Sequence, residues 1–154
     1  METALEILEY QPAHQPWFEQ FNRQWIEKYF TMEPLDFQIL QNPEQHIIEK
    51  GGSVFMASWQ GILAGTVALK FVTPEIYELT KMAVDENFQG RSIGRALAAA
   101  AIARARRNGA KKVFLYSNTM LGPAINLYTK LGFTEIPVDG PYKRSNIKME
   151  LNLS

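Results

Sequence analysis

The sequence predicts an α/β (α+β) domain built around a mixed β-sheet, and three observations carry this prediction. The stretch from Ile76 to Ser117 reads as strand, glycine-containing turn, alanine-rich helix and strand, which is the pattern of a right-handed parallel crossover. Two β-rich runs before it are separated by only Gln60-Gly61, as in an antiparallel hairpin. The run from Ile147 to Leu153 alternates apolar and polar side chains, which is typical of a half-exposed antiparallel strand.

The N-terminal part is predicted to contain one strand and three helices. Alternation from Ala4 to Tyr10 indicates a strand. In a helix from Pro16 to Phe30, aromatic residues recur at intervals of three and four, at Phe18, Phe21, Trp25 and Tyr29. Two shorter helices are each opened by a proline, over Pro34 to Gln41 and Pro43 to Lys50.

The remaining elements alternate between strands and helices. The hairpin strands run from Val54 to Trp59 and from Ile62 to Phe71, and the next strand runs from Ile76 to Val84. A helix from Ile93 to Arg107 ends at a glycine turn. After it we expect a strand at Lys112–Ser117, a helix at Pro123–Leu131 and a strand at Phe133–Val138.

The turn inside the crossover is the first candidate for a binding site. The N–H groups of a first helical turn have no partner within the helix, which suits a phosphate lying above it. Gly90 and Gly94 let a ligand approach the backbone closely, while Arg91 and Arg95 add positive charge. The same residues also suit an ordinary turn between a strand and a helix, so the motif alone leaves both interpretations open.

Charge is segregated along the chain although 16 basic and 16 acidic residues give no formal net charge. No acidic residue occurs between Asn87 and Thr134, where the basic residues are Arg91, Arg95, Arg104, Arg106, Arg107, Lys111, Lys112 and Lys130. This segregation predicts a local anionic ligand and not a general attraction to nucleic acid or membranes. For Arg104, Arg106 and Arg107 the favoured interpretation is a solvated helix face.

Composition limits the classes of function. The 154 residues are 46% hydrophobic, with no cysteine and two histidines. The chain has enough apolar content for a core, whereas disulfides and cysteine nucleophiles are excluded and a metal site is not expected. The longest apolar run, from Ala96 to Ala103, is too short for a membrane span. We therefore expect a soluble, cytoplasmic protein with a single domain over residues 1–154.

Two segments resemble a known family. They are ELTKMAVD, from Glu78 to Asp85, which leads into the turn at Gln89, and AINLYTKLGF, from Ala124 to Phe133. In order and spacing they resemble the GNAT superfamily of acetyl-CoA-dependent N-acetyltransferases. The resemblance implies the GNAT fold, with a central mixed, mostly antiparallel sheet of six to seven strands flanked by about four helices.

The resemblance also implies where acetyl-CoA would bind as cosubstrate. The family turn that holds the pyrophosphate, Q/R-x-x-G-x-G/A, here has Ser92 in place of the first glycine, which we expect to weaken binding without abolishing it. The strand segment at 82–84 would hold the pantetheine arm and polarise the acetyl carbonyl. The residues expected to contact the cofactor are Met82, Ala83, Val84, Gln89, Gly90, Arg91, Ser92, Ile93, Gly94, Arg95, Asn118 and Tyr128.

Two catalytic candidates follow from the same resemblance. Tyr128 matches the tyrosine that protonates the departing thiolate, and Glu78 lies where some members carry a base that deprotonates the amine directly or through water. A base is needed because an alkyl ammonium has a pKa of about 10.4. Alternation predicts that Glu78, Thr80 and Met82 share one strand face unless a bulge intervenes. The alternative to a catalytic role is that Tyr128 packs in the core against the sheet. For Glu78 the alternative is that its side chain faces solvent.

Asn118 matches the family less closely. It follows a strand at the point where pantetheine should enter, but it precedes Ala124 by six residues, where the common family spacing is about three. Its side chain would equally suit a turn of the chain.

The sequence leaves the acceptor open between a small-molecule and a peptide amine, and it leaves a homodimer open. Aromatic residues of the first helix belong either to an acceptor pocket or to the core: Trp17, Phe18, Trp25, Tyr29 and Phe30. Tyr142 and Arg144 either bind an acceptor carboxylate or lie in an exposed loop. Two functions fit the motifs, an N-acetyltransferase that works by direct attack of the amine and a non-catalytic acyl-CoA-binding sensor or interaction module. A third possibility, a nucleotide-binding α/β domain of another kind, would explain the glycine-containing turn at residues 89–95 but not the segment from Leu127 to Phe133.

Overall fold

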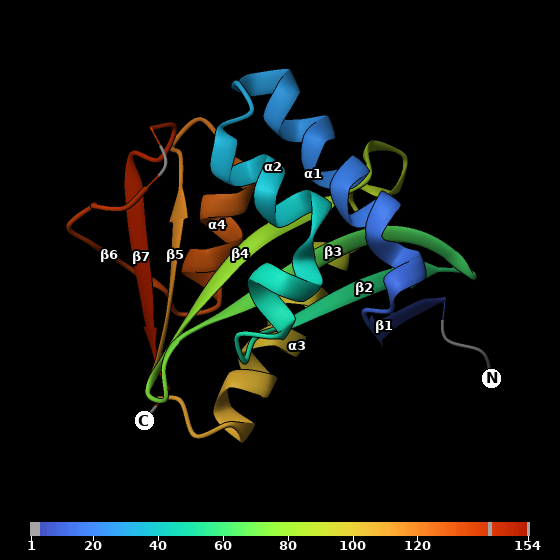
Figure 1. Ribbon diagram of the computed structural model, residues 1–154. Coiled ribbons are helices and arrows are strands. Elements are labelled where there is room, and N and C mark those ends of the chain that lie inside the picture. Colours follow the sequence, from blue (N-terminus) through green and yellow to red (C-terminus); the bar gives the residue numbers. More distant parts are fainter. Residues whose placement is uncertain (1–3, 142, 154) are drawn as a thin grey trace.

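The computed structural model describes residues 4–141 and 143–153. They form a seven-stranded sheet in the order β1-β2-β3-β4-β5-β7-β6, with helices on both faces (Figure 1). Among these residues β4 and β5 pair in parallel, and all the other neighbouring strands pair antiparallel. The predicted mixed, mostly antiparallel sheet is therefore confirmed.

The elements of the N-terminal part follow the predicted order. β1 (Leu5–Glu9) leads through a 3-10 turn (Pro12–His14) into α1 (Gln15–Tyr29) and α2 (Pro34–Gln41). The segment predicted as a helix over residues 43–50 is a single π turn (Glu44–Ile48). In the next hairpin, β2 (Ser53–Trp59) and β3 (Ile62–Thr73) are joined by two residues of positive φ, Gln60 and Gly61, as primed turns require.

The C-terminal part contains the parallel crossover. β4 (Ile76–Val84) and a 3-10 turn (Glu86–Phe88) precede α3 (Ile93–Arg107), and β5 (Lys112–Ser117) follows. α4 (Gly122–Lys130), β6 (Thr134–Ile136) and β7 (Ile147–Asn152) complete the fold. β6 ends before the predicted Val138 because Pro137 has no N–H to donate to the ladder.

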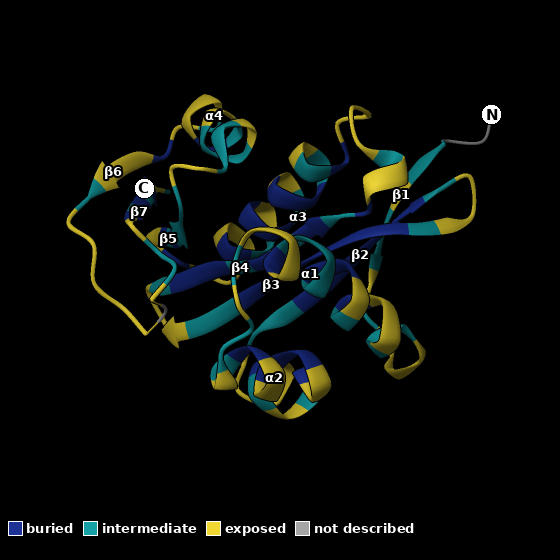
Figure 2. Ribbon diagram, turned by 90° about the horizontal axis from the view of Figure 1, so that it is seen from above, coloured by how far each residue is buried: buried dark blue, intermediate teal, exposed yellow. Residues whose placement is uncertain are grey.

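The buried residues form two hydrophobic clusters, and Figure 2 shows helices covering both faces of the largely buried central strands. One gathers the small buried residues of α3 against the sheet, and it includes Leu97, Ala101 and Tyr128. The other lies under α1 and α2 and includes Phe18, Phe21 and Leu40. Burial of the sheet on both faces explains why its central strands read as nearly continuous apolar runs.

The parallel strands separate after a short pairing. Ile76, Tyr77 and Glu78 of β4 pair with residues 112–114 of β5, yet β4 continues to Val84 and β5 to Ser117. Beyond Glu78 the sheet is therefore open between these two strands. This opening is the feature of the fold that positions the candidate site.

A bulge in β4 changes which side chains face each side of the opening. Thr80 pairs with Ala68 and Ala83 with Thr66, so Lys81 and Met82 together oppose one residue of β3, and Lys81 has a positive φ of 53°. Met82 consequently packs against the α3 cluster. Met82 therefore does not share a face with Glu78 and Thr80, which is the exception that the sequence analysis allowed for a bulge.

Within the described residues, no helix is long and apolar enough to cross a bilayer.

Candidate active site

A pocket of about 780 Å³ occupies the opening between β4 and β5. Its lining comes from both faces of the sheet: α3 and α4 form one side, called here the α3 side, while α1 and the segment before β7 form the other, the α1 side. The predicted site residues that line it are Glu78, Met82, Ala83, Val84, Gln89, Gly90, Ser92, Ile93, Gly94, Arg95, Asn118 and Tyr128. One cavity thus gathers residues from β4, α3 and α4 and from the loops that precede the two helices.

The turn that opens α3 has the backbone form expected of an anion site. Gly90 has a φ of 79° and Ser92 a φ of 61°, both in the left-handed region. The value at Ser92 explains why glycine would suit this position better. A Cβ added at Gly94 would lie 3.6 Å from Leu127 and 3.7 Å from Met82, so the missing side chain leaves room between α4 and β4.

Arg91 does not line the pocket. Its guanidinium lies over the rings of Trp59, at 5.1 Å from the centroid, and Phe88, at 5.6 Å. This cation–π arrangement holds the guanidinium over the two rings. Arg91 is therefore the one predicted cofactor residue that is not part of the pocket lining.

The basic region of the sequence is divided among several sites. Three of its members form ion pairs outside the pocket, Arg104 with Glu9, Lys111 with Glu75 and Lys112 with Glu150. Two members, Arg95 on α3 and Lys130 on α4, line the pocket. Only part of the segregated charge is thus available to an anion bound there.

Tyr128 reaches the pocket from the α3 side. Its ring packs against Phe133 with centroids 5.8 Å apart. Burial raises the pKa of the Tyr128 hydroxyl to about 12, so the side chain is protonated at neutral pH. A protonated phenol at this position has a hydrogen to donate.

Glu78 reaches the pocket from the α1 side and is only 8% exposed. Burial raises its pKa, although the positive charges of Lys70, Lys81 and Lys148 act against the increase. No described basic side chain forms a salt bridge with it. A buried carboxylate that forms no salt bridge with a described residue is a suitable group for taking a proton from an ammonium.

Asn118 lines the pocket, and its side chain also forms hydrogen bonds to the backbone. Its side-chain amide donates to the backbone carbonyl of Arg144 at 2.6 Å, and its carbonyl oxygen accepts from the N–H of Met120 at 2.8 Å. Both polar ends of the side chain therefore connect backbone segments.

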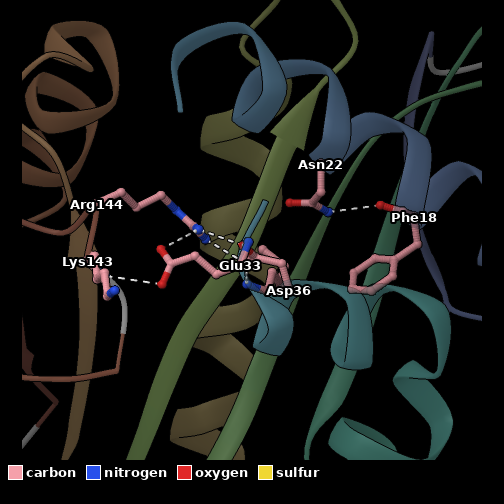
Figure 3. A network of polar contacts seen from close by, with 7 residues as sticks. Phe18, Asn22, Glu33, Asp36, Lys143 and Arg144 are labelled. Carbon is pink, nitrogen blue, oxygen red and sulfur yellow. Dashed lines mark hydrogen bonds and ion pairs between the residues drawn. The ribbon is translucent and has the colours of Figure 1, made fainter. Parts of the chain in front are cut away.

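A buried ionic network on the α1 side was not predicted from the sequence (Figure 3). Asp36 accepts from Lys81 at 2.9 Å and from two nitrogens of Arg144 at 2.7 Å each. Glu33 accepts from Arg144 at 3.2 Å and from the backbone of Lys143. Burial disfavours the charged form of Asp36, but the hydrogen bonds from Arg144 and the charge of Lys81 outweigh it and lower the pKa to about 2. Because the partners come from α2, β4 and the segment before β7, no local motif could have indicated the network.

The aromatic residues of α1 divide between core and pocket. Phe18 is fully buried, and Trp17 is 43% exposed without lining the pocket. Trp25, Tyr29 and Phe30 line the α1 side. Tyr142, which the sequence also singled out, lies outside the described residues.

In the described part of the chain no group of three or more His, Cys, Asp and Glu side chains could hold a metal ion.

Comparison with known proteins identifies the family. A model of the acetyltransferase (GNAT) family matches residues 13–133, which is most of the chain. The chain therefore belongs to the GNAT family of acetyltransferases.

Several relatives are named mycothiol acetyltransferase. The one from Thermobispora bispora is 32% identical over 98 residues, a match that covers 64% of this chain and 32% of that protein. The one from Nocardia farcinica is 38% identical over 69 residues, which cover 45% of this chain and 23% of that protein. The chain thus matches no more than about a third of the length of these relatives.

Solved structures share the fold at low sequence identity. An acetyltransferase of the GNAT family from Staphylococcus aureus Mu50 superposes with a TM-score of 0.89 at 21% identity, covering 98% of this chain and 100% of that one. The PaiA N-acetyltransferase from Thermoplasma acidophilum, solved in complex with coenzyme A, gives 0.76 at 17% identity and covers 97% and 99%.

Proposed function

We propose that this protein transfers the acetyl group of acetyl-CoA to a primary amine by direct attack. The observation that carries the proposal is the pocket through the opening between β4 and β5, which joins the turn at residues 89–95 to Glu78 on one face and to Tyr128 on the other. Such a passage would let a large anionic cosubstrate and a separate amine meet at one point. Each reactant could enter from its own side of the sheet.

Acetyl-CoA would occupy the α3 side. The free N–H groups of the first turn of α3 suit a pyrophosphate, and Arg95 and Lys130 add positive charge. The pantetheine arm would pass Gly94, where no side chain blocks it, and lie along Met82, Ala83 and Val84. A backbone N–H of that segment would hold the carbonyl oxygen as it gains negative charge.

The chemistry divides between two residues. Glu78 removes a proton from the ammonium, directly or through water, and the amine nitrogen then bonds to the thioester carbonyl carbon. The nitrogen then gives up its second proton to water, and the carbon–sulfur bond breaks as the carbonyl re-forms, which leaves a neutral amide. Tyr128 shares its proton with the departing thiolate, whose pKa is about 8.5. Since the pKa of Tyr128 is about 12, full transfer would be uphill, so we propose that the proton is shared in the transition state.

Two comparisons support this proposal. Relatives that match part of this chain are named mycothiol acetyltransferase, a name that describes acyl transfer. The Thermoplasma acidophilum structure with the same fold was solved in complex with coenzyme A. The choice of an amine as acceptor rests on the paired proton-transfer groups in the pocket. A sensor that only binds acyl-CoA has no need of a buried carboxylate and a protonated phenol at the same opening.

Thiol release from acetyl-CoA tests the proposal. The purified protein is incubated with acetyl-CoA and a broad panel of amines, hydrolysis without amine is subtracted, and the N-acetylated product is identified by mass spectrometry. We expect at least one amine to be acetylated at a rate well above hydrolysis. Binding of acetyl-CoA in calorimetry without transfer to any amine would favour the sensor.

A further inference from the structure

We propose that the acceptor is a primary amine on an apolar, ring-sized body that carries no carboxylate. This inference rests on the proposed transferase function and names the class of substrate for the same pocket. It follows from two features of the α1 side, the state of its cations and the side chains that form its wall.

The two cations that line the pocket on the α1 side, Lys81 and Arg144, are committed within the protein. Arg144, whose side chain is 11% exposed, gives two guanidinium nitrogens to Asp36 and also contacts Glu33. Lys81, whose side chain is 2% exposed, binds the same Asp36 carboxylate. Two positive and two negative groups make the network formally neutral.

A carboxylate on the acceptor would therefore be unfavourable. It would leave water for a site where both cations already hold carboxylates and where Glu78 adds a further negative charge. An ammonium in the same place would instead face the carboxylate of Glu78. The alternative in which Arg144 binds an acceptor carboxylate is disfavoured for the same reason.

The wall of the α1 side suits an apolar body. Trp25 and Phe30 meet edge to face with centroids 6.3 Å apart, and Tyr29 lies 6.5 Å from Phe30. All three line the pocket, and Tyr29 is 46% exposed. A half-exposed ring at the mouth of a pocket gains favourable free energy when another apolar surface covers it.

Three matched amines test whether a carboxylate on the acceptor is unfavourable. The rates kcat/KM are measured by thiol release for 2-phenylethylamine, phenylalanine and phenylalanine amide, which share the ring and the amine. We expect phenylalanine to be used at least about 100-fold less well than 2-phenylethylamine, because the two cations that line the α1 side, Lys81 and Arg144, already hold carboxylates of the protein. Phenylalanine amide, of similar bulk but without the negative charge, should recover most of the loss.

Two matched variants test whether the aromatic wall of the α1 side contacts the apolar body of the acceptor. Tyr29→Ala should raise the KM for 2-phenylethylamine about five- to tenfold and leave that for ethylamine nearly unchanged, since only the larger amine reaches the ring. Trp17→Ala is the control: it removes an aromatic residue of the same helix with similar exposure, 43%, that does not line the pocket. It should change neither value.

The outcomes separate the inference from the proposed function. If amines are acetylated but phenylalanine is used as well as its amide, or Tyr29→Ala and Trp17→Ala behave alike, the inference is wrong and the transferase function stands. If no amine of the broad panel is acetylated while acetyl-CoA binds, both fall together.

Discussion

Glu78 and Tyr128 are both buried at the opening of the sheet, and burial acts on them in the same direction with different chemical results. It raises the pKa of the Glu78 carboxyl, which makes the carboxylate a stronger base. It raises the pKa of the Tyr128 hydroxyl as well, which keeps the phenol protonated. One environment thus supplies a better proton acceptor and a stable proton donor on opposite sides of the pocket.

For Tyr128→Phe we predict a kcat lower by about 10²- to 10⁴-fold, the usual contribution of a positioned acid, with nearly unchanged affinity for acetyl-CoA. The ring still fills its place against Phe133, so only the hydroxyl is lost. Steady-state kinetics and calorimetry measure the two quantities. Tyr77→Phe, a buried tyrosine of the same cluster outside the pocket, is the control and should keep full activity. Equal losses in both variants would exclude Tyr128 as the acid.

For Glu78→Gln we predict a changed pH–rate profile. A base with a raised pKa is effective only above that pKa, so the wild-type rate should rise as Glu78 loses its proton. The variant should be about 10²-fold or more slower near neutral pH and should recover at alkaline pH, where the free amine forms unaided. The exposed Glu75→Gln serves as the matched control. A profile of unchanged shape in Glu78→Gln would remove this residue from the mechanism.

At the scale of single residues, the sequence predicted the members of the pocket better than their roles in it. The glycine-containing turn and the LYTKLGF segment pointed to residues that do line one cavity, Arg91 excepted. The ionic network was not predicted, because Asp36, Lys81 and Arg144 lie far apart in the sequence and no local pattern joins them. Their contact depends on how α2, β4 and the last loop fold together.

At the scale of elements, Gly94 at the start of α3 lies between β4 and α4 and has no side chain to fill the space there. For Gly94→Val we predict loss of acetyl-CoA binding in calorimetry, since the added methyl groups would extend toward Leu127 and Met82 and fill the proposed path of the pantetheine. The Cβ alone meets only ordinary contacts, so the fold should persist. Ala99→Val, on the exposed face of the same helix, should bind normally. Unchanged affinity in Gly94→Val would contradict the placement of the cofactor.

Most elements could be predicted because their signals are local. Prolines and glycines mark the helix ends, and the observed bounds of α2, β4, α3 and β5 coincide with the predicted ones. The bulge in β4 could not be located, since it depends on pairing with β3 and not on the alternation of β4 itself. That one extra residue decides which side chains face the α1 side. The extent of the single domain stays a prediction.

At the scale of the whole molecule, Asp36 joins three segments that are distant in the sequence. Its native pKa of about 2 lies below its ordinary value of 3.8, so protonation favours the unfolded state. This contribution to stability is complete above the ordinary value and is lost as the pH falls through about 2. Acid should therefore weaken the connection between α2, β4 and the last loop.

For Asp36→Asn we predict a free energy of unfolding lower by about 3–5 kcal/mol at pH 7, because two buried cations lose their shared carboxylate. The variant should also show a flatter dependence of stability on pH between about 4 and 2. Urea denaturation at several pH values measures both effects. Asp139→Asn, an exposed member of a surface pair with Lys148, should stay close to wild type. An equal slope in Asp36→Asn and wild type would contradict the assignment.

The short pairing of β4 with β5 has a mechanical consequence. Three register positions connect the strands β1 to β4 with the strands β5 to β7, so the sheet consists of two leaves that share a narrow seam. A molecule that lies in the opening and contacts both leaves would link them directly, next to the three paired positions. Its binding would stiffen the sheet as a whole, and the amide protons of both leaves, and not only those at the contact, would exchange more slowly with solvent.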